Sequence, residues 1–120
     1  MPYRPDDVRP PVPGFEAIES GFARSLTHTL TDDDVRRFAE LTGDFNPMHV
    51  DAGFARRTSF GKPIVHGMLS ASLISTMIGM LLPGPEALWV AQTLQFLQPA
   101  YVGDVLTVTA TVKRKSPATR

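Results

Sequence analysis

The sequence has 120 residues, enough for one domain with its own core but too few for two. Twelve Lys and Arg residues balance twelve Asp and Glu residues, and neither sign forms a long block. We therefore expect no nucleic-acid partner and no membrane partner that is recognised by charge. Because the sequence has no Cys, disulfide scaffolds, thiolate metal sites and Cys nucleophiles are excluded.

The N-terminal residues 1–14 hold five of the eleven prolines, which predicts an extended arm ahead of a single domain at 15–120. This arm lacks the apolar stretch of a signal peptide, so the expected location is the cytoplasm. The longest apolar run, 68–82, is interrupted by Ser, Thr and Gly and is shorter than the ~20 residues of a membrane-spanning helix. We interpret it as a buried helix.

A strand is predicted within 15–30, where Phe22, Leu26 and Leu30 fall on one face. Arg24 and His28 share that face and interrupt its apolar character. We expect His28 to be a surface residue rather than a ligand.

A helix is predicted over 31–43. Thr31 and Asp34 fit a capping box, and Gly43 stands where a helix stops. The acidic residues of the first turn complement the helix dipole, so no metal site is expected there.

Two further helices are expected. A short one begins with Asp51 as its cap and turns Phe54 and Ala55 inward. A long one follows His66-Gly67 and runs to Leu82, where Pro83-Gly84-Pro85 closes it. This helix is apolar nearly all round, so it must be enclosed by the rest of the fold.

Two strands, Ala87–Gln98 and Val105–Val112, complete the predicted elements, with a turn at Gly103-Asp104 between them. Strands and helices in this order predict an α+β domain with a mainly antiparallel sheet.

Asp44 and His49 are the candidate catalytic residues. They lie five residues apart across an Asn46-Pro47 turn, which positions both for chemistry beside a carbonyl group. The pattern alone also allows a plain alternative, with Asp44 as a turn residue and His49 as a surface partner of Asp51. Three such side chains without a fourth ligand do not predict a metal site.

The motif that contains this pair resembles the MaoC-like dehydratases, or R-specific enoyl-CoA hydratases. The resemblance rests on Gly43-Asp44-Phe45-Asn46-Pro47-Met48-His49, on Ala55 after five further residues, and on Pro63-Ile64-Val65-His66-Gly67-Met68-Leu69. In kind it extends from about Val35 to Asp104 and includes Gln92-Thr93-Leu94-Gln95-Phe96.

The resemblance implies a hot-dog fold, in which an antiparallel sheet wraps a long central helix, usually within a homodimer. It also implies reversible syn hydration of trans-2-enoyl thioesters of CoA or a carrier protein to (R)-3-hydroxyacyl thioesters. Asp44 and His49 then hold the water, and no cofactor is expected.

Three other positions are candidate substrate-binding residues. The N–H of Gly67, at the positive end of the buried helix, is expected to bind the thioester oxygen. Asn46 is expected to tie the turn to the backbone. His66 has two interpretations, a structural hydrogen bond at the helix entry or a contact with substrate.

The chain departs from the family pattern because members normally continue with two further strands after Val105–Val112. The sequence is therefore expected to be a shortened member whose missing sheet comes from a partner, from rearranged pairing or not at all. Two alternatives to hydration stay open, namely acyl-CoA thioester hydrolysis and a non-catalytic acyl-binding subunit.

Overall fold

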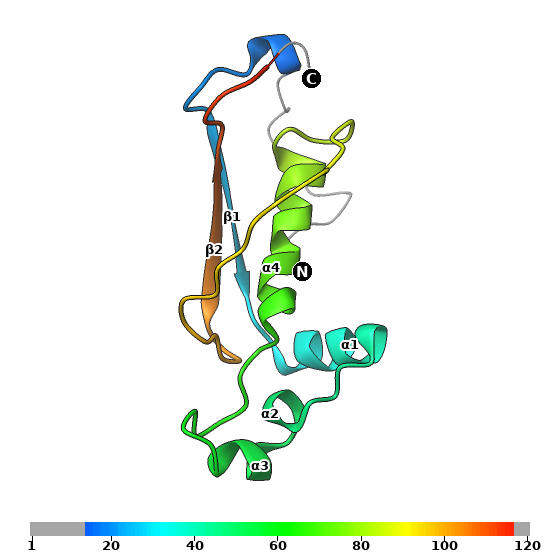
Figure 1. Ribbon diagram of the computed structural model, residues 1–120, viewed down its shortest axis with the longest axis vertical. Coiled ribbons are helices and arrows are strands. Elements are labelled where there is room, and N and C mark those ends of the chain that lie inside the picture. Colours follow the sequence, from blue (N-terminus) through cyan, green and yellow to red (C-terminus); the bar gives the residue numbers. More distant parts are fainter. Residues whose placement is uncertain (1–13, 117–120) are drawn as a thin grey trace. The chain divides into compact units, whose positions relative to one another are not determined.

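The structure is a computed structural model that describes residues 14–116. The predicted arm therefore lies outside the described residues, apart from Gly14. Figure 1 shows the helices and strands along the chain. The chain divides into two compact units. In the described part, unit 1 comprises 14–27, 73–91 and 107–116, and unit 2 comprises 28–72 and 92–106.

Two strands, β1 (Ala23–Thr29) and β2 (Val105–Thr111), form one sheet. In unit 1 their antiparallel pairing is extended by Gly21 N–H, which donates to Val112 O at 2.7 Å, and by Val112 N–H, which donates to Phe22 O at 2.9 Å. Both strand predictions are confirmed. With the helices they form an α+β structure with a small antiparallel sheet.

The long helix consists of ten α-helical residues, α4 (Gly67–Thr76), followed by five π-helical residues, Met77–Leu81. The predicted extent is therefore confirmed. The prediction that this helix is enclosed is wrong for Met68 and Met80, which are 55% and 37% exposed. Its buried residues in unit 1 pack with the sheet in one apolar cluster made of Ile18, Leu26, Met77, Leu81 and Leu82.

Helix α1 (Asp32–Thr42) opens unit 2 with the predicted capping box, in which Asp34 N–H donates to Thr31 Oγ1 and Thr31 N–H donates to Asp34 Oδ2, each at 3.0 Å. Gly43 ends α1 in the left-handed conformation, with φ 79°. The prediction that His28 lies on the surface is wrong. Its side chain is 8% exposed and its Nε2 lies 2.7 Å from Asp34 Oδ2.

Two short helices follow, α2 (Pro47–Val50) and α3 (Ala52–Arg56). Asp51 caps α3 as predicted, and Ala55 is buried, but Phe54 is 36% exposed and does not turn inward. Its ring instead faces solvent and lies under the Arg57 guanidinium, 5.8 Å from ring centroid to Cζ. The Asn46-Pro47 pair begins α2 rather than forming an isolated turn.

The core of unit 2 holds the segment that leads into α4. Leu30, Val35 and Val65 are buried together. Val65 N–H donates to Ala100 O at 2.7 Å, and Ile64 forms an antiparallel bridge with Tyr101. The segment just before α4 is therefore fixed on one side by backbone pairing.

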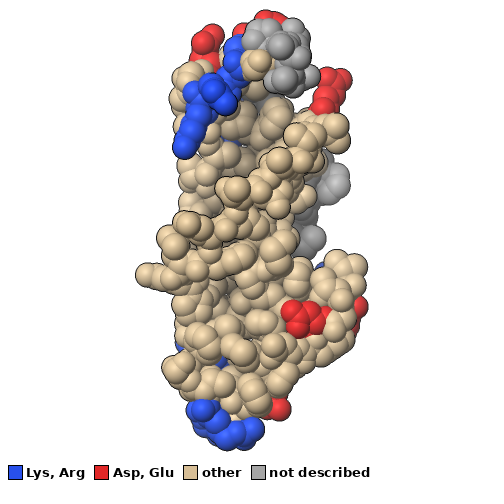
Figure 2. All heavy atoms as spheres, in the orientation of Figure 1, with Lys and Arg blue, Asp and Glu red and all other residues tan. Residues whose placement is uncertain are grey.

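The predicted strand Ala87–Gln98 is absent from the structure of residues 14–116, and this prediction is wrong. Alternating apolar residues describe a strand face, but a strand also requires a paired backbone. In the described chain no neighbour pairs with this segment, and Leu88, Val90 and Leu97 are 84%, 82% and 85% exposed. Consistent with such exposure, charged side chains are sparse on the face shown in Figure 2.

Within residues 14–116 no helix combines the length and the apolar character needed to cross a bilayer.

Candidate active site

Asp44 is positioned by the end of α1. The left-handed Gly43 turns the chain, and Asp44 N–H then donates to Thr42 Oγ1 at 3.2 Å. The Asp44 carboxylate accepts a hydrogen bond from Asn46 N–H at 3.1 Å through Oδ1. Asp44 is exposed, and among the described residues no hydrogen bond uses its second carboxylate oxygen.

His49 lies on α2 and is half-buried. Its Nδ1 is 2.7 Å from the carbonyl oxygen of Ile64. Because a carbonyl only accepts hydrogen bonds, Nδ1 carries a proton and donates it. The nitrogen left for chemistry is therefore Nε2.

His66 directly precedes α4 and is 2% exposed. Its Nε2 lies 3.0 Å from the backbone oxygen of Asp44, so by the same reasoning Nε2–H is the donor. Its ring stacks on His49 with centroids 3.9 Å apart and planes at 29°, and it meets Phe38 of α1 at 4.8 Å. His66 thus contacts both members of the candidate pair.

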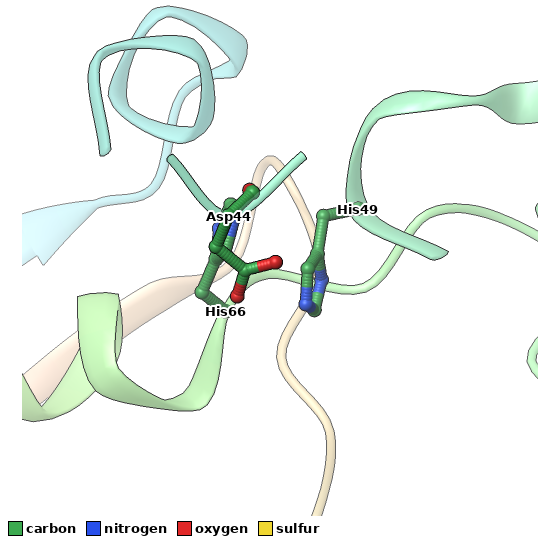
Figure 3. A group of neighbouring side chains, drawn as sticks. All are labelled: Asp44, His49 and His66. Atoms are coloured by element: carbon green, nitrogen blue, oxygen red, sulfur yellow. The ribbon is translucent and has the colours of Figure 1, made fainter. Parts of the chain in front are cut away.

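The three side chains converge (Figure 3). One ligand atom from each of Asp44, His49 and His66 lies within 4.8 Å of the others. Two hydrogen bonds of about 2.8 Å each span up to about 5.6 Å. A single water can therefore bridge the Asp44 carboxylate and a ring nitrogen of His49.

The same three groups are poorly arranged for a metal ion. A metal binds imidazole in the ring plane at about 2.0 Å. The His49 and His66 rings stack face to face, with centroids 3.9 Å apart and planes at 29°, whereas two imidazoles that bind one ion meet it through their ring edges. One nitrogen of each ring is also engaged by a backbone carbonyl.

Gly67 is the first residue of α4, where a helix leaves its N–H without an intrahelical partner. Among the described residues no hydrogen bond uses that N–H. A Cβ at this position would lie 3.2 Å from the Phe96 ring, so the absence of a side chain keeps the approach to the Gly67 N–H open.

Asn46 caps α2, with its Oδ1 accepting from Met48 N–H at 3.0 Å. The expected tie between Asn46 and the backbone is present.

Similarity to known proteins identifies the family. The family described as "MaoC like domain" matches residues 15–120. The chain belongs to the MaoC-like dehydratase family. It is 43% identical over 106 residues to the 3-hydroxybutyryl-CoA dehydratase of Methylorubrum extorquens, covering 88% of this chain and 68% of the relative. It is 46% identical over 98 residues to the (R)-specific enoyl-CoA hydratase of Rhodospirillum rubrum, covering 82% and 68%.

Solved structures of this MaoC-like family agree with that result. The (R)-hydratase of Aeromonas caviae, which is involved in PHA biosynthesis, superposes with a TM-score of 0.82 at 40% identity over 85% of this chain and 77% of that chain. The unliganded R-hydratase of Pseudomonas aeruginosa gives a TM-score of 0.83 at 40% identity, covering 87% and 67%. The predicted family resemblance is confirmed.

The structure brings together Asp44, His49 and His66 and places Gly67 at the helix start beside them in the chain. The stack between the two imidazoles was not predicted from the sequence. His66 follows Asp44 by 22 residues, and no local pattern indicates that the chain returns to the same point.

Proposed function

We propose that this MaoC-like protein is an (R)-specific enoyl-CoA hydratase, a hydro-lyase that reversibly adds water to trans-2-enoyl thioesters. The observation that carries the proposal is the convergence of the Asp44 carboxylate and the His49 imidazole within reach of one water. The relatives named as hydratases and dehydratases support the same chemistry.

Hydration requires one base and one acid, so Asp44 and His49 share one proton between them. Asp44 offers an exposed carboxylate as proton acceptor, and the Ile64 carbonyl leaves Nε2 of His49 as the available nitrogen, so we assign Asp44 as the base and His49 as the acid.

Asp44 removes a proton from water as the water oxygen bonds to C3 of the enoyl group. The π electrons move toward the thioester oxygen, and His49 gives its Nε2 proton to C2. Proton transfer from Asp44 back to His49 restores the pair. Because both groups face the same water, hydrogen and hydroxyl add to one side of the double bond, which is syn addition.

Negative charge develops on the thioester oxygen during this step. We assign its stabilisation to the Gly67 N–H at the start of α4, where the helix dipole adds to the hydrogen bond. Asn46 supports the site through its cap on α2 rather than as a direct substrate ligand.

The substrates we propose are thioesters of CoA or of an acyl carrier protein. Relatives named for CoA substrates and a tomato relative named 3-hydroxyacyl-[acyl-carrier-protein] dehydratase support both carriers. We also propose the complete hot-dog arrangement, with the sheet wrapped round the long helix in a homodimer. The exposed apolar segment 88–97 supports a partner of that kind.

Activity is tested with a short trans-2-enoyl-CoA by following the loss of absorbance of the conjugated double bond. We expect Asp44→Asn and His49→Ala each to lower kcat by about 10²–10⁴-fold, since each removes one proton-transfer group. Asp33→Asn is the matched control because Asp33 is an exposed carboxylate paired with Arg37 on α1. Equal rates in all four proteins would reject the assignment.

Two further results would indicate another function. Release of free thiol from a saturated acyl-CoA would indicate thioester hydrolysis, and tight acyl-CoA binding without turnover would indicate an acyl-binding subunit.

A further inference from the structure

His66 is the most buried polar side chain of the site, and its contacts exceed what a helix entry requires. It is 2% exposed, yet it contacts Asp44 through the backbone and His49 through its ring. We infer that His66 is a positioning residue that fixes both members of the acid–base pair and touches neither water nor substrate. This inference rests on the proposed hydratase function.

The first contact sets the position of Asp44. His66 Nε2–H donates to Asp44 O at 3.0 Å, and this bond joins the entry to α4 with the residue that follows α1. Among the described residues, the other hydrogen bonds of Asp44 stay within 42–46: its N–H donates to Thr42 Oγ1, and its Oδ1 accepts from Asn46 N–H. Loss of the His66 donor would therefore release the loop relative to α4.

The second contact sets the plane of the His49 ring. The Ile64 carbonyl fixes Nδ1 at 2.7 Å but permits the ring to rotate about that bond. The His66 ring, stacked at 3.9 Å, blocks such rotation from one side. Together the two contacts direct His49 Nε2 toward one place.

The remaining nitrogen of His66 argues against a direct catalytic role. Nε2 is engaged by Asp44 O, and Nδ1 is shielded from solvent with no hydrogen-bond partner among the described residues. A buried acceptor without a hydrogen-bond partner ordinarily destabilises a protein. A histidine whose role is stability alone would not leave its Nδ1 unpaired. A histidine whose role depends on its Nε2 donor and its flat ring can leave Nδ1 unpaired.

Three variants separate the two contacts. His66→Gln retains an N–H donor at the same number of bonds from Cβ and loses the ring. His66→Phe retains the ring and loses the donor, and His66→Leu loses both. We expect kcat to fall roughly 10-fold in the Gln and Phe variants and about 10²-fold in the Leu variant, as for small misplacements of reacting groups. KM should stay within about twofold of the wild type, because substrate binding is untouched.

The outcomes are decisive in either direction. A rise in KM that matches the fall in kcat would show that His66 contacts substrate and would overturn the proposal. Unchanged kcat in His66→Leu, or equal loss in all three variants, would overturn it as well. Thermal unfolding of each variant separates loss of activity from loss of fold.

A second measurement needs neither activity nor a variant. Side-chain ¹⁵N NMR of the wild-type protein should show a proton on His66 Nε2 and a lone pair on its Nδ1, with a proton on Nδ1 of His49. Proton–proton NOEs should connect the two rings. The opposite tautomer of His66, or the absence of those NOEs, would refute the positioning role. If the wild type has no hydratase activity while the NMR result is as expected, the proposed function fails and the structural coupling stands.

Discussion

Gly67 matters for two reasons, its backbone N–H and the small space beside its Cα. Among the described residues no hydrogen bond uses its N–H at the first position of α4, and a Cβ there would lie 3.2, 3.3 and 3.5 Å from three atoms of the Phe96 ring. Phe96 is 59% exposed, so its ring can move aside by the few tenths of an ångström that a methyl group needs. Substitution at Gly67 can therefore remove the donor without abolishing the fold.

Gly67→Pro should lower kcat by about 10²–10³-fold, the usual cost of losing one donor to a developing oxyanion. Proline is tolerated at the first position of a helix, and His66 before it is not helical, so α4 should still form. Gly67→Ala is the matched control, since it adds a Cβ but keeps the N–H. Steady-state kinetics of both variants check the prediction, which fails if alanine costs as much as proline.

At the same scale, the sequence predicted the pair Asp44 and His49 because local spacing and the Asn46-Pro47 dipeptide position both. It did not predict the partners that come from distant elements. The surface prediction for His28 failed because the half-buried Asp34 supplies a partner at 2.7 Å, and sequence spacing does not give that distance. The contact between His66 and His49 was missed for the same physical reason.

The Asp34 carboxylate stabilises helix α1 through two contacts. Asp34 Oδ2 accepts from Thr31 N–H in the capping box and lies 2.7 Å from His28 Nε2. Burial raises the pKa of Asp34, but the hydrogen bonds from His28 and Thr31 outweigh it and hold the pKa below 3.8. Since α1 ends at Gly43 beside Asp44, this cap also orders the element that carries the proposed base.

Asp34→Asn should lower the free energy of unfolding by about 1 kcal/mol near neutral pH, because the amide can still accept from Thr31 N–H but loses the negative charge that interacts with His28 and with the helix dipole. Because folding lowers the pKa of Asp34, its contribution is complete above the unfolded-state pKa and disappears as pH falls through the lower folded-state value. The difference in unfolding free energy between wild type and variant should therefore close in acid, as pH falls through the lowered folded-state pKa of Asp34. Urea unfolding at several pH values measures it.

Asp33→Asn is the control for that experiment. Asp33 is exposed and pairs with Arg37 one turn along α1, so its loss should cost only a few tenths of a kcal/mol. A gap for Asp34→Asn that stays constant with pH, or that Asp33→Asn reproduces, would contradict the role assigned to Asp34.

Elements with local stop and start signals were predicted well. The capping box, Gly43 and the Asp51 cap lie within a few residues of what they terminate, so they can be read without the fold. The π-helical end of the long helix was not predicted, because the apolar run has no local signal that distinguishes the two helix types.

For the whole molecule, the outcome depends on the segment 88–97. Its alternation is that of a strand, yet in the described chain it has no strand partner, and its apolar residues face solvent. The alternation of apolar residues predicts which side chains of a strand need burial. Strand pairing in the folded protein determines which neighbour buries them. For this segment the pattern predicts burial, whereas the described chain leaves Leu88, Val90 and Leu97 exposed, and the homodimer proposed above is what would cover them.

The proposed homodimer predicts that this segment is covered in solution. Leu97→Lys should shift the protein toward monomer, because it places a charge on an apolar surface that association would bury. Leu41→Lys on α1 is the matched control, since Leu41 is 84% exposed and Leu97 is 85% exposed. Sedimentation velocity over a range of concentrations measures the association.

Hydrogen exchange adds an independent readout. The amides of 88–97 should become protected with rising concentration in the wild type and in Leu41→Lys, but not in Leu97→Lys. A wild-type protein that stays monomeric with rapidly exchanging amides in 88–97, or an equal effect of both lysine variants, would exclude this segment as the dimer surface.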